Sequence, residues 1–249
     1  MQANVQRATT NTDAVASFGT DLACQAGAHL LRLRDTAIAT AKGKSDIVTE
    51  ADHFVQAFII EKIAQRFPDH QIIAEEGASH APQPIRDVCW VIDPLDGTLN
   101  YALGLPFFAV SIALLEQRRP VCAWVFDPTH EQLFFARRGH GAWCNQEPLA
   151  PNKGAAATRP VVAISSGALR HLLMQIPGED SAQPLLECLG KIRNLGAQSL
   201  HLCHVATGAF SAALSWEARL WDDAAGALIV EEAGFVYSHF DGTSVFPLE

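Results

Sequence analysis

The chain has few basic residues, no long apolar run and no segment of the secretory kind at its start. Lys and Arg number 18 against 27 Asp and Glu, so the formal net charge is −9. Proteins that bind nucleic acid meet its phosphates with clustered Lys and Arg, so nucleic acid is not expected as the main partner. No stretch is long enough to span a bilayer, and residues 1–13 lack the apolar segment of a signal peptide. We therefore expect no membrane partner.

The cysteines, histidines and serines also lack the common metal and catalytic spacings. The six cysteines include no Cys-x-x-Cys pair, which argues against a zinc finger and against a small disulfide scaffold. His201 and His204 lie three positions apart without the Glu of a zincin motif, so packing is favoured over metal binding. Gly-x-Ser-x-Gly is absent, which disfavours covalent catalysis. These absences indicate a soluble protein of a reducing compartment, and the cytoplasm is the expected location.

What is present is typical of a globular protein with mixed secondary structure. Hydrophobic residues make up 49% of the chain and charged residues 18%. Mixed helices and strands indicate a layered α/β architecture. Apolar spacing and turn residues predict helices over residues 13–41, 49–67, 200–214 and 221–233, and strands over residues 71–74, 89–92, 108–115, 120–126, 132–136 and 161–165.

The most informative segment is Asp93-Pro94-Leu95-Asp96-Gly97-Thr98, which follows the strand predicted over residues 89–92. Pro94 and Gly97 end that strand in a rigid turn from which both carboxylates project. Hard divalent cations bind such oxygen ligands and leave positions open for water and a phosphate ester. The alternative is an Asp-rich turn without a ligand, because Asp, Pro and Gly are common in turns.

Three other acidic positions flank this motif. Glu75 follows a short predicted strand, Asp222 is expected at a helix N-terminus, and Asp52 lies in the first turn of another predicted helix. Each acid taken alone fits a structural role, above all helix capping. Together with Asp93 and Asp96 they favour a shared metal site.

Four blocks in this order resemble the inositol monophosphatase family of magnesium-dependent, lithium-sensitive phosphatases. The resemblance covers roughly residues 13 to 245, far more than one short motif gives by chance. It implies the α/β (α+β) fold class, as the layered αβαβα sandwich of the inositol monophosphatase and fructose-1,6-bisphosphatase type. The blocks are Lys42-Gly43-Lys44-Ser45-Asp46-Ile47-Val48-Thr49-Glu50-Ala51-Asp52, Ala74-Glu75-Glu76-Gly77, Asp93-Pro94-Leu95-Asp96-Gly97-Thr98-Leu99-Asn100-Tyr101 and Trp221-Asp222-Asp223-Ala224-Ala225-Gly226.

The resemblance also implies a set of metal ligands. It implies two or three Mg²⁺ ions, which would neutralise the phosphate, stabilise the leaving alkoxide and lower the pKa of a bound water. Every ligand position is an oxygen donor, as magnesium requires. The positions that match are Glu75, Asp93, the main-chain carbonyl of Leu95, Asp96 and Asp222.

Other positions match the residues that act on the water and on the phosphate. Thr98 and Asp52 correspond to the pair that orients and deprotonates the attacking water. The N–H groups of Gly97 and Thr98 would hold phosphate oxygens, helped by a helix that starts there. Lys42 has the spacing of the family's lysine and would act on a metal-bound water, with Lys44 as an alternative in the same loop.

Two positions that would contact the substrate depart from the family pattern. Gln198 is bulky where the family usually has a small residue, and Glu217 lies in a loop that is about two residues short by the motif spacing. The expected substrate is a small polyol or sugar phosphate such as inositol 1-phosphate. Fructose-1,6-bisphosphate, histidinol phosphate and 3′-phosphoadenosine nucleotides remain alternatives, as does a non-catalytic regulatory relative.

The organisation expected from these matches is one compact catalytic unit in two halves. Residues 1–12 are predicted to be a flexible leader. Residues 13–150 form an N-terminal α+β half with the metal site, and residues 151–249 form a C-terminal α/β half that supplies Asp222 and the substrate contacts. The family normally continues through another strand and helix beyond Phe246, so we expect either a sheet edge that a partner chain covers or a shortened sequence. By resemblance, a homodimer is expected.

Overall fold

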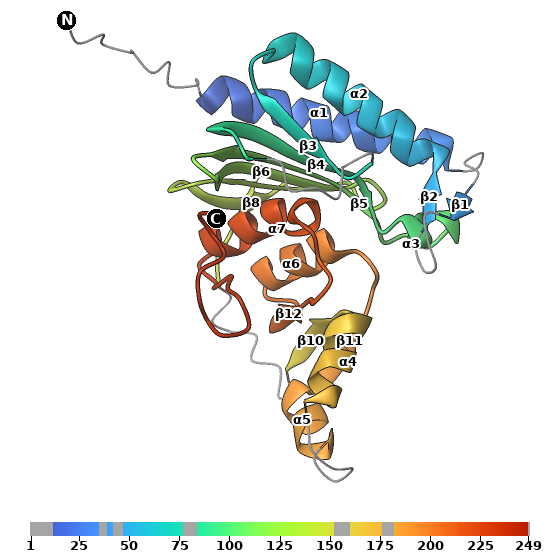
Figure 1. Ribbon diagram of the computed structural model, residues 1–249, viewed down its shortest axis with the longest axis vertical. Helices are drawn as coiled ribbons and strands as arrows, with labels where there is room; N and C mark the ends of the chain where they lie inside the picture. Colours follow the sequence, from blue (N-terminus) through green and yellow to red (C-terminus); the bar gives the residue numbers. More distant parts are fainter. Residues whose placement is uncertain are drawn as a thin grey trace, which may run out of the picture.

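A computed structural model describes residues 12–34, 39–41, 47–76, 84–151, 160–175 and 182–248. The chain forms five layers that alternate helices and sheets, with two helices at each end and two between the sheets (Figure 1). The layered αβαβα sandwich is therefore confirmed. The helices are α1 (Thr12–Leu33), α2 (Glu50–Arg66), α3 (Thr98–Ala102), α4 (Ser166–Met174), α5 (Ala182–Leu189), α6 (Gln198–Ala206) and α7 (Leu220–Glu232).

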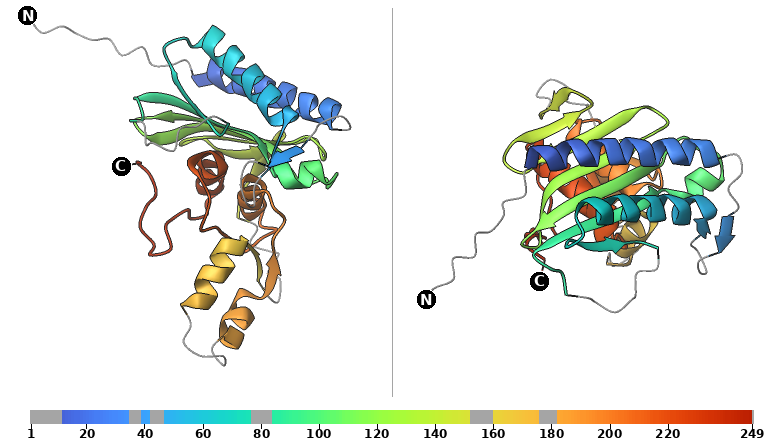
Figure 2. Two further views of the ribbon diagram at one scale, coloured as in Figure 1. Left: turned by 45° about the vertical axis from the view of Figure 1, so that its right-hand side comes forward. Right: turned by 90° about the horizontal axis from the view of Figure 1, so that it is seen from above.

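The larger sheet has seven strands and lies beneath α1 and α2, which cross one of its faces side by side (Figure 2). β3 and β4 are parallel, and every later neighbouring pair is antiparallel. The strands predicted in this region are confirmed, although the fourth strand extends beyond the predicted residue 92. In order across the sheet they are β3 (Gln71–Ala74), β4 (Val88–Asp96), β5 (Ala109–Glu116), β6 (Arg119–Asp127), β7 (Gln132–Arg137), β8 (Gly141–Cys144) and β9 (Glu147–Leu149).

Both faces of this sheet are buried. Alternate residues of a strand point to opposite faces. On β4, Trp90 and Ile92 join the cluster that packs beneath α1 and α2. Cys89 and Val91 join a second cluster, which α6 and α7 complete from the other side. The apolar run in β4 is continuous because both of its faces are covered.

The second core cluster joins residues from both predicted halves of the chain. Val91 and Phe134 of the large sheet share it with Leu200 of α6 and Leu228 of α7. The division at residue 150 stays a prediction, since residues 152–159 lie outside the described ranges. In the described part of the chain, no helix has the length and apolarity that crossing a membrane requires.

The smaller sheet is three-stranded and parallel, in the order β11 (Lys191–Arg193), β10 (Val161–Ile164), β12 (Ala212–Leu214). The helix predicted over residues 200–214 is wrong beyond Ala206. Gly208 has φ = 78°, a value that favours glycine and ends the helix. Residues 212–214 then pair with β10, because the sheet satisfies their backbone groups.

The helix predicted over residues 13–41 is also too long. α1 ends at Leu33, and Ala39–Ala41 forms β1, which pairs antiparallel with β2 (Ile47–Thr49). Pairing satisfies backbone groups of both short strands, and it outweighs the helical preference of the alanines. By contrast, the helix predicted over residues 49–67 is confirmed as α2, which Thr49 caps.

Candidate functional site

The turn at the end of β4 is a bulge that carries two buried carboxylates. The pairing of β4 with β5 shifts register between Asp93 and Asp96, and Pro94 between them has no N–H to give to a neighbouring strand. Leu95 N donates to Asp93 Oδ1 at 2.9 Å. Asp93 is 2% exposed and Asp96 8% exposed. The bulge therefore places both acids at the end of β4, as the sequence motif predicts, and local backbone orients Asp93.

Gly97 brings this turn against the C-terminal half of the chain. Its φ is +90°, and a Cβ there would lie 2.9 Å from Phe107 O and 3.2 Å from Ala197 Cβ. Asn100 reinforces the contact, because its Nδ2 donates to Phe107 O and to Leu195 O, both at 2.7 Å. Only glycine combines this φ with such a close approach.

Thr98, the first residue of α3, faces Asp52 at the start of α2. Thr98 Oγ1 lies 3.1 Å from Asp52 Oδ1 and 3.0 Å from Leu95 O. The other carboxylate oxygen, Asp52 Oδ2, accepts bonds from Thr49 N at 2.8 Å and from Thr49 Oγ1 at 2.5 Å. Asp52 thus caps its helix with one oxygen and meets Thr98 with the other.

Asp96 receives the first residues of α6. Gln198 N donates to Asp96 Oδ1 at 3.1 Å. Ser199 donates twice to Asp96 Oδ2, from its N at 2.6 Å and from its Oγ at 2.5 Å. Asp96 therefore satisfies backbone donors that a helix N-terminus leaves without intrahelical partners.

Asp222 and Glu75 complete the acidic cluster from two further elements. Asp222 lies in the first turn of α7, and its Oδ2 accepts a bond from Arg219 N at 2.6 Å. Glu75 directly follows β3, and its N donates to Ile92 O of β4 at 3.1 Å. Gln56 of α2 bonds to both backbone groups of the next residue, Glu76. Glu76 N donates to Gln56 Oε1 at 2.8 Å, and Gln56 Nε2 donates to Glu76 O at 2.7 Å.

Besides α3, three helices begin at this site, and an aspartate bonds to backbone N–H groups at the start of each of them. The aspartates are Asp52 for α2, Asp96 for α6 and Asp222 for α7. The N-terminus of a helix carries partial positive charge, which stabilises carboxylates nearby. The N-cap residues themselves are Thr49 and Arg219, and Asp52 and Asp222 are the third helical residues of the two capping boxes. Asp222 thus lies at a helix N-terminus as expected, but Arg219 occupies the N-cap position.

The carboxylates of the cluster act on one another. Burial raises the pKa of Asp93 well above its usual range, and the charges of Glu75, Asp96 and Asp222 raise it further. Burial likewise raises the pKa of Asp96 to about 6, against the bonds from Ser199 and Gln198 that lower it. Burial and then the charge of Asp96 raise the pKa of Asp222 to about 8. These acids resist full ionisation unless positive charge is brought among them.

The pKa of Asp52 is perturbed for the same main reason, burial. Burial of its carboxyl group raises the pKa to about 6, although the bonds from Thr49 and Thr98 lower it. The charge of Glu76 adds a smaller increase. A carboxyl group with this pKa changes protonation near neutral pH, which suits proton transfer.

Among the described residues, no three Asp, Glu, His or Cys side chains are grouped closely enough to hold a metal ion. The hydrogen bonds explain this arrangement in part. Asp93, Asp96 and Asp222 each direct at least one carboxylate oxygen onto backbone N–H groups. Each carboxylate oxygen can accept two bonds, so these contacts leave further capacity for a cation.

The two predicted substrate contacts have partners away from this cluster. Gln198 Nε2 donates to Asp223 Oδ1 at 2.9 Å. Glu217 accepts bonds from Ser165 Oγ at 2.7 Å and from Gly167 N at 2.9 Å, at the start of α4. These bonds lower the pKa of Glu217, although burial raises it. Lys42, and Lys44 in the same loop, lie outside the described residues.

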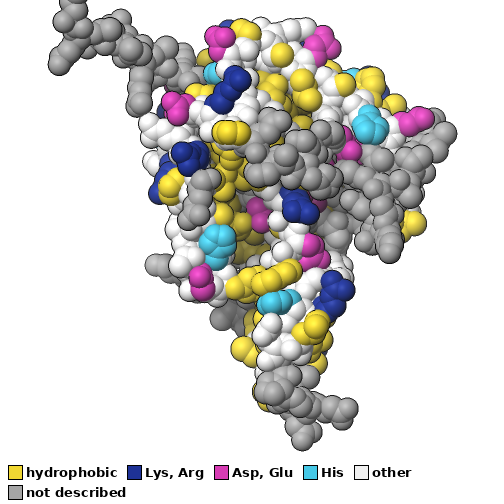
Figure 3. Space-filling view, viewed as in Figure 1, with side chains coloured by type: hydrophobic (Ala, Val, Ile, Leu, Met, Phe, Trp, Pro, Cys, Tyr) yellow, Lys and Arg dark blue, Asp and Glu magenta, His cyan; other side chains and the backbone are white. Residues whose placement is uncertain are grey.

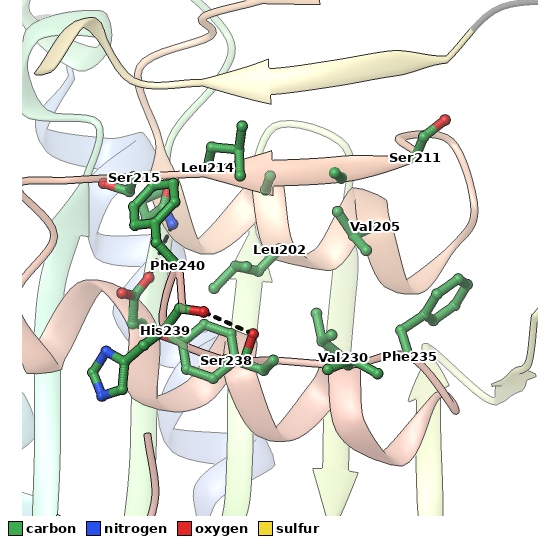
Figure 4. A pocket seen from close by; sticks show the side chains of 16 residues that line it. Leu202, Val205, Ser211, Leu214, Ser215, Val230, Phe235, Ser238, His239 and Phe240 are labelled. Carbon is green, nitrogen blue, oxygen red and sulfur yellow. Dashed lines mark hydrogen bonds between the residues drawn. The ribbon is translucent and has the colours of Figure 1, made fainter. Parts of the chain in front are cut away.

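A cavity of about 470 Å³ lies between α6, β12, α7 and the segment that follows α7, and Figure 4 shows its lining. Leu202, Val205 and Val230 contribute apolar side chains, while Gln198 and Asp223 also line it. The face of the molecule drawn in Figure 3 is hollowed, with apolar side chains gathered in the hollow. The cavity adjoins the acidic cluster through Gln198, whose N bonds to Asp96.

Three site residues have no role in the sequence analysis. Ser199 and Asn100 join the β4 turn to the C-terminal half, and no local signal marks them because their partners are about 100 positions distant in the chain. Gln56 had a usable signal. It lies four positions after Asp52 on a helix, and residues with that spacing share a face.

The comparisons with known proteins agree with this fold. The family model described as the inositol monophosphatase family matches residues 6–249. The Nus factor SuhB of Haemophilus influenzae is 39% identical over 210 residues, which are 84% of this chain and 77% of the relative. The inositol-1-monophosphatase of Bacillus subtilis is 31% identical over 205 residues, which are 82% of this chain and 77% of that protein.

A solved structure supports the same assignment. The inositol monophosphatase from Anabaena (Nostoc) is 31% identical, covers 94% of this chain with 87% of its own, and superposes with a TM-score of 0.76. The fold, the acidic site and these likenesses define a phosphatase of the layered αβαβα type. The chain belongs to the inositol monophosphatase family.

Proposed function

We propose that this protein is a magnesium-dependent phosphomonoesterase that hydrolyses a small polyol or sugar phosphate, such as inositol 1-phosphate, by attack of an activated water. The observation that carries the proposal is the contact of Thr98 with Asp52, 3.1 Å between Oγ1 and Oδ1. Thr98 is separated from Asp96, a member of the acidic cluster, by Gly97 alone. Family membership and the inositol monophosphatases among the relatives support it further.

The donors fit magnesium in chemistry. They are oxygen atoms only, and the acids among them raise one another's pKa, so cations would relieve their repulsion. When bound, two or three Mg²⁺ ions would supply positive charge to the phosphate and to the leaving alkoxide. The residues that would hold them are Glu75, Asp93, the carbonyl of Leu95, Asp96 and Asp222.

The pair of Thr98 and Asp52 would take a proton from the attacking water. When the Thr98 hydroxyl donates to Asp52, the lone pairs of Oγ1 remain available to accept a bond from water. Asp52 has a pKa of about 6, so at neutral pH it is ionised and can receive the proton through Thr98. Thr49 holds the other oxygen of Asp52, which keeps the carboxylate in place.

The phosphate and alcohol groups would meet other residues. We propose that the N–H groups of Gly97 and Thr98 hold phosphate oxygens. The predicted roles of Lys42 toward the water, and of Gln198 and Glu217 toward the alcohol, stay predictions. For Gln198 and Glu217, substrate contact would require their side chains to leave Asp223 and the start of α4.

The test is release of inorganic phosphate from a panel of phosphomonoesters, with and without Mg²⁺. The panel includes inositol 1-phosphate, fructose-1,6-bisphosphate, histidinol phosphate and 3′-phosphoadenosine 5′-phosphate. We expect turnover that requires Mg²⁺, is highest on the polyol or sugar phosphates and is inhibited by lithium. The absence of Mg²⁺-dependent turnover on every substrate would contradict the enzyme proposal, and preference for another member would change the substrate.

A second candidate is a regulatory protein that keeps the fold without relevant turnover. The observation that favours it is the name Nus factor SuhB, which the Haemophilus influenzae relative carries. A protein released from catalysis is free to lose its site residues, yet Glu75, Asp93, Asp96 and Asp222 are all present. The substrate panel separates the two candidates.

We further propose a cytoplasmic homodimer whose main partner is a small phosphorylated metabolite. The net charge of −9 supports a partner other than nucleic acid. Size-exclusion chromatography with light scattering would report a mass of twice 26.9 kDa for a dimer. A mass of 26.9 kDa at micromolar concentration would contradict it.

A further inference from the structure

We propose that Ser199 is a positioning residue for Asp96, and that its buried hydroxyl holds the carboxylate in the orientation that binds a divalent cation. This inference rests on the proposed function, because it takes Asp96 as a metal ligand. It assigns a role to a residue that would itself touch neither the ion nor the substrate.

The contacts of Ser199 are dedicated to one oxygen of Asp96. Its N lies 2.6 Å and its Oγ 2.5 Å from Asp96 Oδ2. Ser199 is 0% exposed, so water cannot replace the hydroxyl if it is removed. Gln198 N holds the other oxygen, Oδ1, at 3.1 Å. The carboxylate is therefore held at both ends, and more tightly on the side of Ser199.

The support of Asp96 differs in kind from that of its neighbours. Asp93 accepts a bond from Leu95 N, and Asp222 accepts one from Arg219 N, so local backbone holds each of them. At Asp96 the donors come from residues 102 and 103 positions away, and one of them is a side-chain hydroxyl. The orientation of Asp96 thus depends on how α6 docks, and the hydroxyl is the contact that a point substitution can remove.

The hydrogen bonds leave Asp96 able to bind a cation. Oδ1 accepts one bond from Gln198 N, so it keeps capacity for a further partner. Without the Ser199 hydroxyl, only backbone donors would restrain rotation of the carboxylate. Removal of such outer partners typically lowers metal affinity about 10- to 100-fold.

The test compares Ser199→Ala with Ser165→Ala. Ser165 also donates its hydroxyl to a carboxylate, Glu217 Oε2 at 2.7 Å, but at the start of α4. Binding of Mn²⁺ is measured by calorimetry and by the electron paramagnetic resonance signal of free Mn²⁺. We expect affinity to fall about tenfold in Ser199→Ala and to stay at the wild-type value in Ser165→Ala. Half-saturating Mg²⁺ for turnover should rise in parallel, with kcat largely restored at high Mg²⁺.

Other results would overturn the inference. Wild-type Mn²⁺ affinity in Ser199→Ala would do so, as would an equal loss in Ser165→Ala. If Ser199→Ala does not fold, Ser199→Cys takes its place: its thiol is a weaker donor of similar shape, so affinity should lie below wild type, and an unchanged value counts against the proposal. If the wild-type protein itself binds no Mn²⁺, the metal site of the proposed function is wrong. That result is distinct from failure of the Ser199 inference alone, in which the wild-type protein binds Mn²⁺ and Ser199→Ala binds it equally well.

Discussion

Thr98 and Asp52 meet 46 positions apart in the sequence, with Thr98 Oγ1 3.1 Å from Asp52 Oδ1. The contact joins the first residue of α3 to the first turn of α2. Because Thr49 holds the second oxygen of Asp52 at 2.5 and 2.8 Å, the carboxylate cannot turn away from Thr98 without losing the cap of α2. A helix cap thus fixes the geometry of the pair to which we assign proton transfer in the proposed function.

The first prediction concerns this pair. Thr98→Val keeps the shape of the side chain but removes the hydroxyl, so kcat should fall about 100-fold or more, the range of lost general-base catalysis. Thr98→Ser keeps the hydroxyl and should retain most of the activity. Initial rates of phosphate release over a range of substrate concentrations give kcat and KM for both variants. Equal rates for Thr98→Val and wild type would remove Thr98 from the mechanism.

The second prediction concerns the glycine of the turn. Gly97→Ala should destabilise the fold, because a Cβ would lie 2.9 Å from Phe107 O as well as sit at φ = +90°. The matched control is Gly104→Ala, which has φ = +75° and nothing within 4 Å of the added carbon. We expect a loss of about 1 kcal/mol for Gly104→Ala, and a larger one, about 3 kcal/mol, for Gly97→Ala. Urea unfolding measures both, and equal losses would show that the close approach is unimportant.

The third prediction concerns pH in the absence of divalent metal. Burial and neighbouring acids raise the folded-state pKa of Asp222 to about 8. At a pH between the pKa values of the unfolded and folded states, Asp222 is therefore protonated in the folded state and ionised in the unfolded state. Stability should therefore fall as pH rises toward 8, by about 1 kcal/mol per pH unit for one such group.

The window from pH 7 to 8 isolates most of this effect. Burial lowers the pKa of His201 to about 4. The opposite contribution of His201 is therefore mostly complete by pH 7, where about three quarters of the unfolded histidine has lost its proton. Urea unfolding with EDTA at the two pH values gives the slope, and Asp222→Asn should flatten it. Mg²⁺ should restore stability at pH 8. A stability that rises over this window would be inconsistent with the clustered acids.

The fourth prediction concerns Gln56, whose amide holds both backbone groups of Glu76 at 2.7 and 2.8 Å. Gln56→Leu should free the segment that carries Glu75, lower metal affinity about tenfold and cost about 2 kcal/mol of stability. Gln65→Leu is the control, since Gln65 lies on the same helix and, among the described residues, its amide bonds only to exposed Glu61 at 2.8 Å. Calorimetry with Mn²⁺ reads the affinity. Equal affinities for the two variants would show that Gln56 does not support the site.

Local patterns in the sequence were enough to predict much of the fold. Apolar runs bounded by turn residues predicted β5, β6 and β7, and the capping residues around Thr49 predicted the start of α2. For two short segments, however, the local sequence pattern predicted helix where the structure has a strand. Ala39–Ala41 and Ala212–Leu214 became strands because backbone partners lay beside them in the folded chain.

The candidate site divides in the same way. Asp93, Asp96, Gly97 and Thr98 form one short motif, so their oxygen donors and their spacing can be recognised without knowledge of distant residues. The partners of the predicted substrate contacts could not be predicted from a short motif in this way. The Gln198 side chain bonds to Asp223, and the Glu217 carboxylate bonds to the start of α4; both partners are distant in the sequence. Glu217 also accepts a bond from its neighbour, Trp216 N.

The sequence by itself determined which residues are candidates for the chemistry: five acids, a threonine and a glycine turn whose oxygen donors and spacing favour a divalent cation and a phosphate ester. Only the tertiary structure decided how these groups are held. The docking of α6 gives Asp96 its hydrogen bonds from Ser199, and burial gives the acids their raised pKa values. The physical reason is that hydrogen bonds and desolvation depend on neighbours in space, and the chain brings those neighbours from about 100 positions away.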